Sequence, residues 1–165
     1  AHQCGFQNAL DYADYGLSAD FDGYYVISTA EELYGFAALV NNGRTSAKGV
    51  LTADIVVNEN VLNADGTLNG TPTYRWNPIG IFTKKFSGTF DGNGHTISGL
   101  YFNEETKYNA PSGGTYVGLI SSADEATIKN VGLVDSYLKA SPGIFSERIP
   151  HSNPAWIVTT CGSVP

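Results

Sequence analysis

The segment Phe86–Asn103, FSGTFDGNGHTISGLYFN, constrains the fold more than any other part of the chain. Two short runs rich in β-forming residues flank a polar turn at residues 91–94, DGNG. A related pattern returns thirty-one residues later, where residues 127–131, TIKNV, align with residues 96–100, TISGL. A recurring short strand with a Gly-rich corner predicts a stack of short coils.

Further strands are predicted on both sides of this segment. Residues 24–27 form a short apolar run, residues 50–57 read VLTADIVV, and residues 116–120 and 126–138 carry the last clear patterns of this kind. Alternation along these runs predicts that a set of apolar side chains faces inward. The set consists of Leu51, Ile55, Val57, Phe90, Ile97, Leu100, Phe102, Val117, Leu119, Ile128, Val131 and Leu133.

One amphipathic helix is predicted over residues 28–42. It begins with Ser-Thr-Ala-Glu, in which Ser28 and Glu31 have the spacing of a capping box, and it ends at the sequence Asn-Asn-Gly. Leu33, Phe36 and Val40 recur at helical spacing. Because a stack of coils exposes an unpaired strand edge at its end, this helix is expected to act as a cap.

Three sequence pieces carry a resemblance to a known family. They are YYVISTAEELYGFAALVNNG, then WNPIG with FSGTFDGNGHTISGL, and finally YVGLISSADEATIKNVGLVDSYL. In this order they resemble the repeat modules of bacterial surface proteins that carry the GLUG motif, which also occur in IgA-peptidase-like and filamentous-haemagglutinin-like adhesins. The resemblance covers about residues 24–139. It implies a right-handed parallel β-helix, a secreted or cell-surface location, an adhesive or structural role, and no catalytic residues.

The predicted fold class is therefore all-β, a short right-handed parallel β-helix with one N-terminal capping α-helix. Residues 1–23 are predicted to be an irregular N-terminal segment, and residues 24–140 the β-helix domain. Residues 141–165 are predicted to be a C-terminal tail, because the prolines at 142, 150 and 154 interrupt any regular continuation. Within that tail, residues 156–160 read as a strand that has no evident partner in the sequence.

The composition narrows the range of partners and locations. The chain carries 9 basic and 16 acidic residues, a net charge of −7, which would repel a phosphate backbone and argues against nucleic acid as a partner.

No apolar run is long enough for a transmembrane helix, so membrane insertion is not expected. The chain starts at Ala1 and contains no Met. This favours a mature secreted chain after removal of a signal peptide, although trimming would look the same.

The two cysteines, Cys4 and Cys161, stand near opposite ends of the chain. In a secreted protein a disulfide is favoured over two buried free thiols. The sequence leaves open whether the bond forms within one molecule or between two. No Cys/His spacing indicates a metal, and no cofactor is predicted.

Two polar segments could suggest chemistry, but one is better explained as a turn and the other as a solvated loop. Asp91-Gly92-Asn93-Gly94-His95 has a carboxylate beside a histidine, but Gly and Asn are also the residues that a tight turn requires. Residues 63–69, NADGTLN, alternate oxygen-bearing side chains as calcium loops do, yet they lack the closing carboxylate. A solvated loop is therefore favoured over calcium, and no catalytic residue is assigned.

Aromatic residues supply candidate glycan contacts, because aromatic rings stack on the apolar faces of sugars. Tyr74, Trp76 and Tyr108 are the candidates, and the competing interpretation is that such rings fill the core.

The function predicted from the sequence is non-enzymatic: an extracellular structural or adhesive protein that associates with copies of itself, in the form of a filament if the contact is head-to-tail. The residues assigned to assembly lie in the terminal segments, where strand addition would supply main-chain hydrogen bonds. They are Cys4, Trp156, Ile157, Val158, Thr159 and Cys161. A carbohydrate-binding surface module, binding host or environmental glycans, and a polysaccharide-degrading β-helix enzyme are the alternatives.

Overall fold

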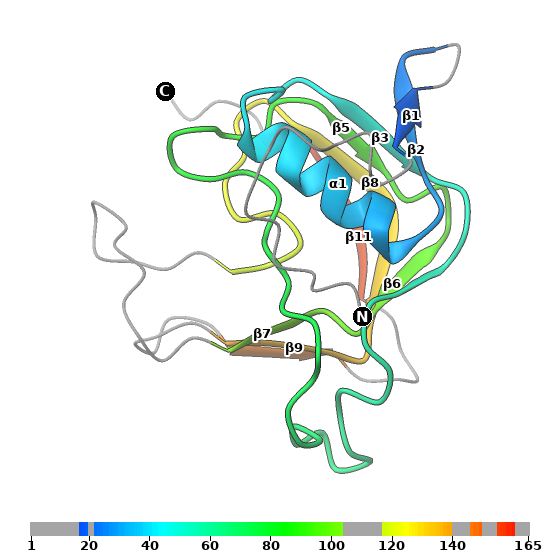
Figure 1. The fold of residues 1–165 in the computed structure, drawn as a ribbon, viewed down its shortest axis with the longest axis vertical. Coiled ribbons are helices and arrows are strands. Elements are labelled where there is room, and N and C mark those ends of the chain that lie inside the picture. Colours follow the sequence, from blue (N-terminus) through cyan, green and yellow to red (C-terminus); the bar gives the residue numbers. More distant parts are fainter. Residues whose placement is uncertain (1–16, 20–21, 104–116, 140–145, 150–154, 161–165) are drawn as a thin grey trace.

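The computed structural model describes residues 17–19, 22–103, 117–139, 146–149 and 155–160, the last two ranges through their backbone alone. It contains the helix α1 (Ala30–Asn41) and short strands on either side of it (Figure 1). The strands are β1 (Ser18–Ala19), β2 (Tyr24–Ile27), β3 (Lys48–Leu51), β4 (Ile55–Val56), β5 (Thr89–Asp91), β6 (Thr96–Ser98), β7 (Tyr101–Asn103), β8 (Thr127–Val134), β9 (Ser136–Lys139), β10 (Ser146–Ile149) and β11 (Ala155–Thr160).

Six strands form a parallel sheet in the order β2-β3-β5-β8-β6-β4. The long strand β8 joins its two halves, because residues 127–129 pair with β5 and residues 132–134 pair with β6. Two strands extend this sheet with antiparallel pairing, β1 next to β2 and β11 next to β8. A second, smaller sheet has the order β10-β9-β7.

The prediction of an all-β, right-handed parallel β-helix is wrong, since the fold is mixed α/β with one helix and a parallel sheet of six strands. The helix explains the difference. Strand β2, helix α1 and strand β3 follow one another in the chain, and β2 pairs in parallel with β3. Parallel neighbours need a crossover connection, and α1 provides it. The helix is thus a central part of a βαβ unit and not the end cap that the sequence pattern predicts.

Helix α1 begins one residue later than the predicted capping box. Thr29 is the N-cap, its hydroxyl accepts a hydrogen bond from the Glu32 N–H at 3.2 Å, and the Glu32 carboxylate accepts from the Thr29 N–H at 3.1 Å. Ser28 adds to this arrangement, because both its N–H and its hydroxyl donate to Glu32. A capping box of this kind stabilises a helix start by about 1 kcal/mol.

The buried face of α1 packs against the sheet, as Figure 1 shows for the region of β3, β5 and β8. The Phe36 ring lies 5.8 Å from the ring of Phe90 on β5 and 6.3 Å from that of Tyr25 on β2. Gly49 on β3 leaves room for it, because a Cβ there would lie 2.9 Å from the Phe36 ring. The pairing of a large ring with a glycine sets the distance between helix and sheet.

The core was largely predictable from alternation along the strands. All but one of the twelve residues predicted to face inward are buried, and Val117 is partly buried. Several large side chains outside that set of twelve are also fully buried, among them Tyr34, Phe36, Trp76 and Phe86.

The terminal segments differ from the prediction where they are described. Strand β1 lies inside the segment 1–23 that was expected to be irregular, and it pairs with β2. The strand predicted at 156–160 is present as β11, but it pairs with β8 of the same chain. The described residues contain no helix that is long and apolar enough to cross a membrane.

Candidate functional site

Four of the six residues that the sequence assigns to assembly lie within the described part of the chain, and all four belong to β11. Trp156, Ile157, Val158 and Thr159 belong to this strand, whereas Cys4 and Cys161 lie outside the described residues. Among the described strands, β11 pairs with β8 alone, so within the described part of the chain its other side is an edge of the sheet. The unpaired N–H and C=O groups of such an edge can pair with another chain.

The direction of individual backbone groups in β11 follows from the pairing. The N–H of Gly132 on β8 donates a 3.2 Å hydrogen bond to the carbonyl of His95. His95 lies just before β6, so this N–H points toward β6. Neighbouring N–H groups along a strand point to opposite edges, so the N–H groups on either side of Gly132 face β11. Gly132 lies opposite Trp156. The backbone N–H of Trp156 therefore faces away from β8, toward the open edge.

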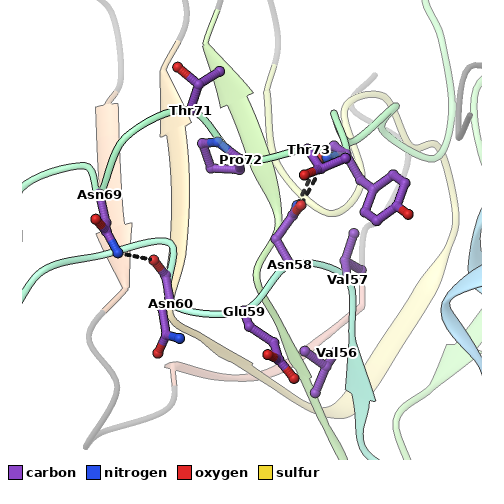
Figure 2. A pocket seen from close by; sticks show the side chains of 10 residues that line it. Val56, Val57, Asn58, Glu59, Asn60, Asn69, Thr71, Pro72 and Thr73 are labelled. Atoms are coloured by element: carbon purple, nitrogen blue, oxygen red, sulfur yellow. Dashed lines mark hydrogen bonds between the residues drawn. The ribbon is translucent and has the colours of Figure 1, made fainter. Parts of the chain in front are cut away.

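A groove lies at a second place, between the two arms of the loop that follows β4. Residues 56–60 form one wall, residue 69 and residues 71–74 form the other, and the cavity volume is about 520 Å³ (Figure 2). The loop closes beyond the groove through the pairing of Leu62 with Leu68 and a 2.8 Å hydrogen bond from the Asn69 N–H to the Val61 carbonyl.

Side-chain amides join the two walls of the groove. Asn58, which is 7% exposed, donates through Nδ2 to the Tyr74 carbonyl at 2.7 Å and accepts from the Tyr74 N–H at 2.9 Å. Its Nδ2 also donates to the Gly99 carbonyl at 2.8 Å. Asn69 donates through Nδ2 to the Asn60 carbonyl at 2.9 Å, the contact that Figure 2 shows at the other end of the groove. Both ends are thus fixed by hydrogen bonds.

The base of the loop is anchored to the end of β8. Asp135, which is buried, accepts hydrogen bonds from the N–H groups of Val61 at 3.1 Å and Leu62 at 2.9 Å. Asn60 has a φ of 53°, a conformation that Asn tolerates better than most residues, and it directs the chain into this contact. The walls of the groove therefore have a defined position relative to the sheet.

The predicted glycan contacts have different places in the structure. Tyr74 is partly buried and lines the groove. Trp76 is fully buried, with its ring 5.2 Å from that of Tyr34 and its Nε1 donating to the Gly118 carbonyl at 3.0 Å. Its ring has no free face for a sugar, so the core interpretation holds for this residue. Tyr108 lies outside the described residues.

The segment 91–94 forms a tight turn, and its backbone angles and hydrogen bonds account for its polar residues. Asn93 and Gly94 have φ values of 51° and 82°, and the Asp91 carboxylate accepts from the Asn93 N–H at 2.8 Å. Gly92 is required for a different reason, because a Cβ there would overlap the backbone of Asn130 and Val131 on β8. The turn thus lies directly against the neighbouring strand.

The two ionisable groups of this turn have separate partners. Burial alone would raise the pKa of Asp91, but hydrogen bonds from Asn93 and Asn130 and the ammonium of Lys129, 3.4 Å away, lower the pKa below its ordinary value. His95 lies 3.2 Å from Asp54, not beside Asp91. The Thr96 N–H, 2.9 Å from the Asp54 carboxylate, is the main cause that lowers the pKa of Asp54.

The loop considered for calcium is closed by its own hydrogen bonds. Asp65 accepts from both the N–H and the hydroxyl of Thr67, at 2.9 Å and 2.6 Å, and Asn63 donates to the same hydroxyl at 3.0 Å. Within the described residues no group of three His, Cys, Asp or Glu side chains could hold a metal ion. The solvated-loop interpretation accounts for the oxygen-bearing side chains of this segment.

Comparisons with known proteins add no identification. No family model matches the chain, and neither the curated proteins nor the solved structures gave a match. The resemblance to GLUG-type surface modules stays a prediction.

Tyr74 is the one groove residue that the sequence predicts as a ligand contact, whereas the residues that hold the walls in place carry no such signal. Asn58 and Asp135 act through contacts with residues distant in the sequence, and a lone Asn after a strand carries no specific signal. Asp135 follows a strand and precedes Ser136, a position at which a turn is the simplest expectation.

Proposed function

We propose that this chain is a non-enzymatic, secreted or cell-surface structural or adhesive protein, whose copies associate by strand addition at the outer edge of β11. The observation that carries this proposal is the single pairing of β11 among the described strands. The six residues of β11, Ala155–Thr160, offer a longer edge than β1 or β4, which have two residues each. The low fraction of charged residues, 15%, and the net charge of −7 support the extracellular location.

The structure changes how β11 could take part in assembly. A strand without a partner would be donated to a neighbouring molecule, whereas β11 already pairs with β8 and offers its far side. Pairing of β11 with β11 of a second copy would give a two-fold dimer. Pairing with a different edge, such as that of β10, would leave an edge free at each end and give a filament.

The test uses the direction of the Trp156 N–H. Proline at position 156 removes a donor that faces the open edge, and proline is tolerated in edge strands at such positions. Trp156→Pro is therefore expected to lose self-association and to keep the wild-type circular dichroism spectrum. Trp156→Ala is the matched control, because it removes the same side chain and retains the N–H.

Sedimentation velocity and electron microscopy of the full chain give the readout. Dimers or filaments in the wild type and in Trp156→Ala, with monomers in Trp156→Pro, would support the proposal. A wild type that stays monomeric at about 1 mM would overturn it, and so would a Trp156→Pro variant that is folded and assembles normally. Repeating the measurement with reductant tests the separate expectation that Cys4 and Cys161 hold the joints.

A further inference from the structure

We propose that the groove between residues 56–60 and 69–74 binds an uncharged oligosaccharide. The proposal concerns a different surface from the β11 edge and does not depend on self-association. It starts from the size of the cavity, about 520 Å³, which lies within the range of small-molecule binding sites.

The walls of the groove hold their positions before any ligand binds. Asn58 ties the first wall to the second at Tyr74 and also to Gly99, next to β6. Asn69 ties the second wall back to Asn60 at the other end. A site whose walls are already ordered loses less conformational entropy on binding, which matters most for weakly bound ligands such as sugars.

The side chains that line the groove match the chemistry of a sugar. Glu59 and Asn60 on one wall, and Thr71 and Thr73 on the other, are exposed. Together they offer a carboxylate acceptor, an amide that donates and accepts, and hydroxyls that do both. Sugar hydroxyl groups require this mixture because each is a donor and an acceptor. Figure 2 shows Glu59 and Asn60 on the same arm of the loop, and Thr71 and Thr73 on the other.

Apolar surface in the groove complements the C–H faces of a sugar ring. Val56 is 53% exposed, Pro72 is half-buried, and the half-buried Tyr74 lies at the same wall as Pro72. Aromatic rings of this kind present an apolar face with a polar tip. The combination of an apolar strip with amide and hydroxyl groups favours a saccharide over a purely polar ligand.

The charge of the groove selects among saccharides. Glu59 is the charged residue of the lining, and no Lys or Arg lines the groove. An acidic sugar would meet the Glu59 carboxylate as well as the net charge of −7. The preferred ligand is therefore a neutral oligosaccharide.

The test compares neutral and acidic probes on defined variants. Neutral trisaccharides of glucose, galactose, mannose and N-acetylglucosamine are titrated into the ¹⁵N-labelled full chain, with a galacturonic acid trisaccharide as the acidic probe. Amide shifts within 56–60 and 69–74, with at least one neutral probe, are the expected result. The double variant Glu59→Ala/Thr71→Ala should weaken that binding about tenfold or more, because the loss of a hydrogen bond to a charged group has about this effect.

Glu31→Gln serves as the matched control. Glu31 is an exposed carboxylate in the first turn of α1, remote in sequence from the groove, and its removal should leave the affinity unchanged. Neither Glu59 nor Thr71 is buried, so the double variant should retain the wild-type melting temperature. Three results would overturn the proposal: no neutral probe binding at 10 mM, equal binding by the double variant, or a preference for the acidic probe.

Discussion

Replacing Asn58 with alanine tests whether the groove is held by the hydrogen bonds of a single side chain. The buried amide donates to the carbonyls of Tyr74 and Gly99 and accepts from the Tyr74 N–H. Asn58→Ala removes all three bonds. The Tyr74 N–H and the carbonyls of Tyr74 and Gly99 then lose these hydrogen bonds in a region that is mostly buried. A net contribution of about 1 kcal/mol for each bond gives an expected loss of about 3 kcal/mol.

The loss is large enough to measure by thermal unfolding. For a chain of this length, 1 kcal/mol corresponds to a shift of about 2–4 °C, so Asn58→Ala should melt about 6–12 °C below the wild type. Urea unfolding followed by circular dichroism gives an independent free energy of unfolding. Asn77→Ala is the matched control, since Asn77 is exposed, and its effect should stay within about 0.5 kcal/mol.

A second substitution at the same position separates hydrogen bonding from packing. Asn58→Asp keeps the size of the side chain and the acceptor for the Tyr74 N–H, but it loses both donors and places a negative charge beside the carbonyls of Tyr74 and Gly99. It should therefore destabilise the protein more than alanine does at pH 7. A loss below about 1 kcal/mol for Asn58→Ala, or an aspartate variant as stable as the wild type, would refute the reasoning.

Two further predictions concern the turn at 91–94. Gly92→Ala should cost about 2–3 kcal/mol in denaturant unfolding because its Cβ would meet the backbone of Asn130. Gly94→Ala should cost about 1 kcal/mol, because the added Cβ would meet open space and only the positive φ is unfavourable. Equal losses of stability in the two variants would contradict the close packing of the turn on β8. Asp91 has a lowered pKa in the folded state, so its contribution to stability is present above its unfolded pKa of about 3.9 and is lost as the pH falls through the folded value. The melting temperature of Asp91→Asn should accordingly fall less between pH 6 and pH 3 than that of the wild type, and parallel pH profiles would argue against this assignment.

The sequence by itself determined the local elements of this protein. Alternation located strands in the middle of the chain and nearly all of the inward residues, although it joined β3 and β4 into one run and gave no sign of β1 or β10. Helical spacing and the Ser-Thr start located α1 to within two residues, and Asn-Gly located the turn at 91–94. These features depend on neighbours in the chain, so they leave a pattern in the sequence.

Tertiary structure alone decided how the elements are joined and where the candidate sites lie. The parallel pairing of β2 with β3, which makes α1 a crossover, and the pairing of β11 with β8 involve residues far apart in the chain. The groove depends on Asn58 reaching Tyr74 and Gly99, and the burial of Trp76 depends on Tyr34 and Gly118. Strand patterns specify which side chains face a core, but they do not specify the partner strand. The partner is chosen by packing across the whole sheet, and that choice decided both the fold class and the surfaces available for binding.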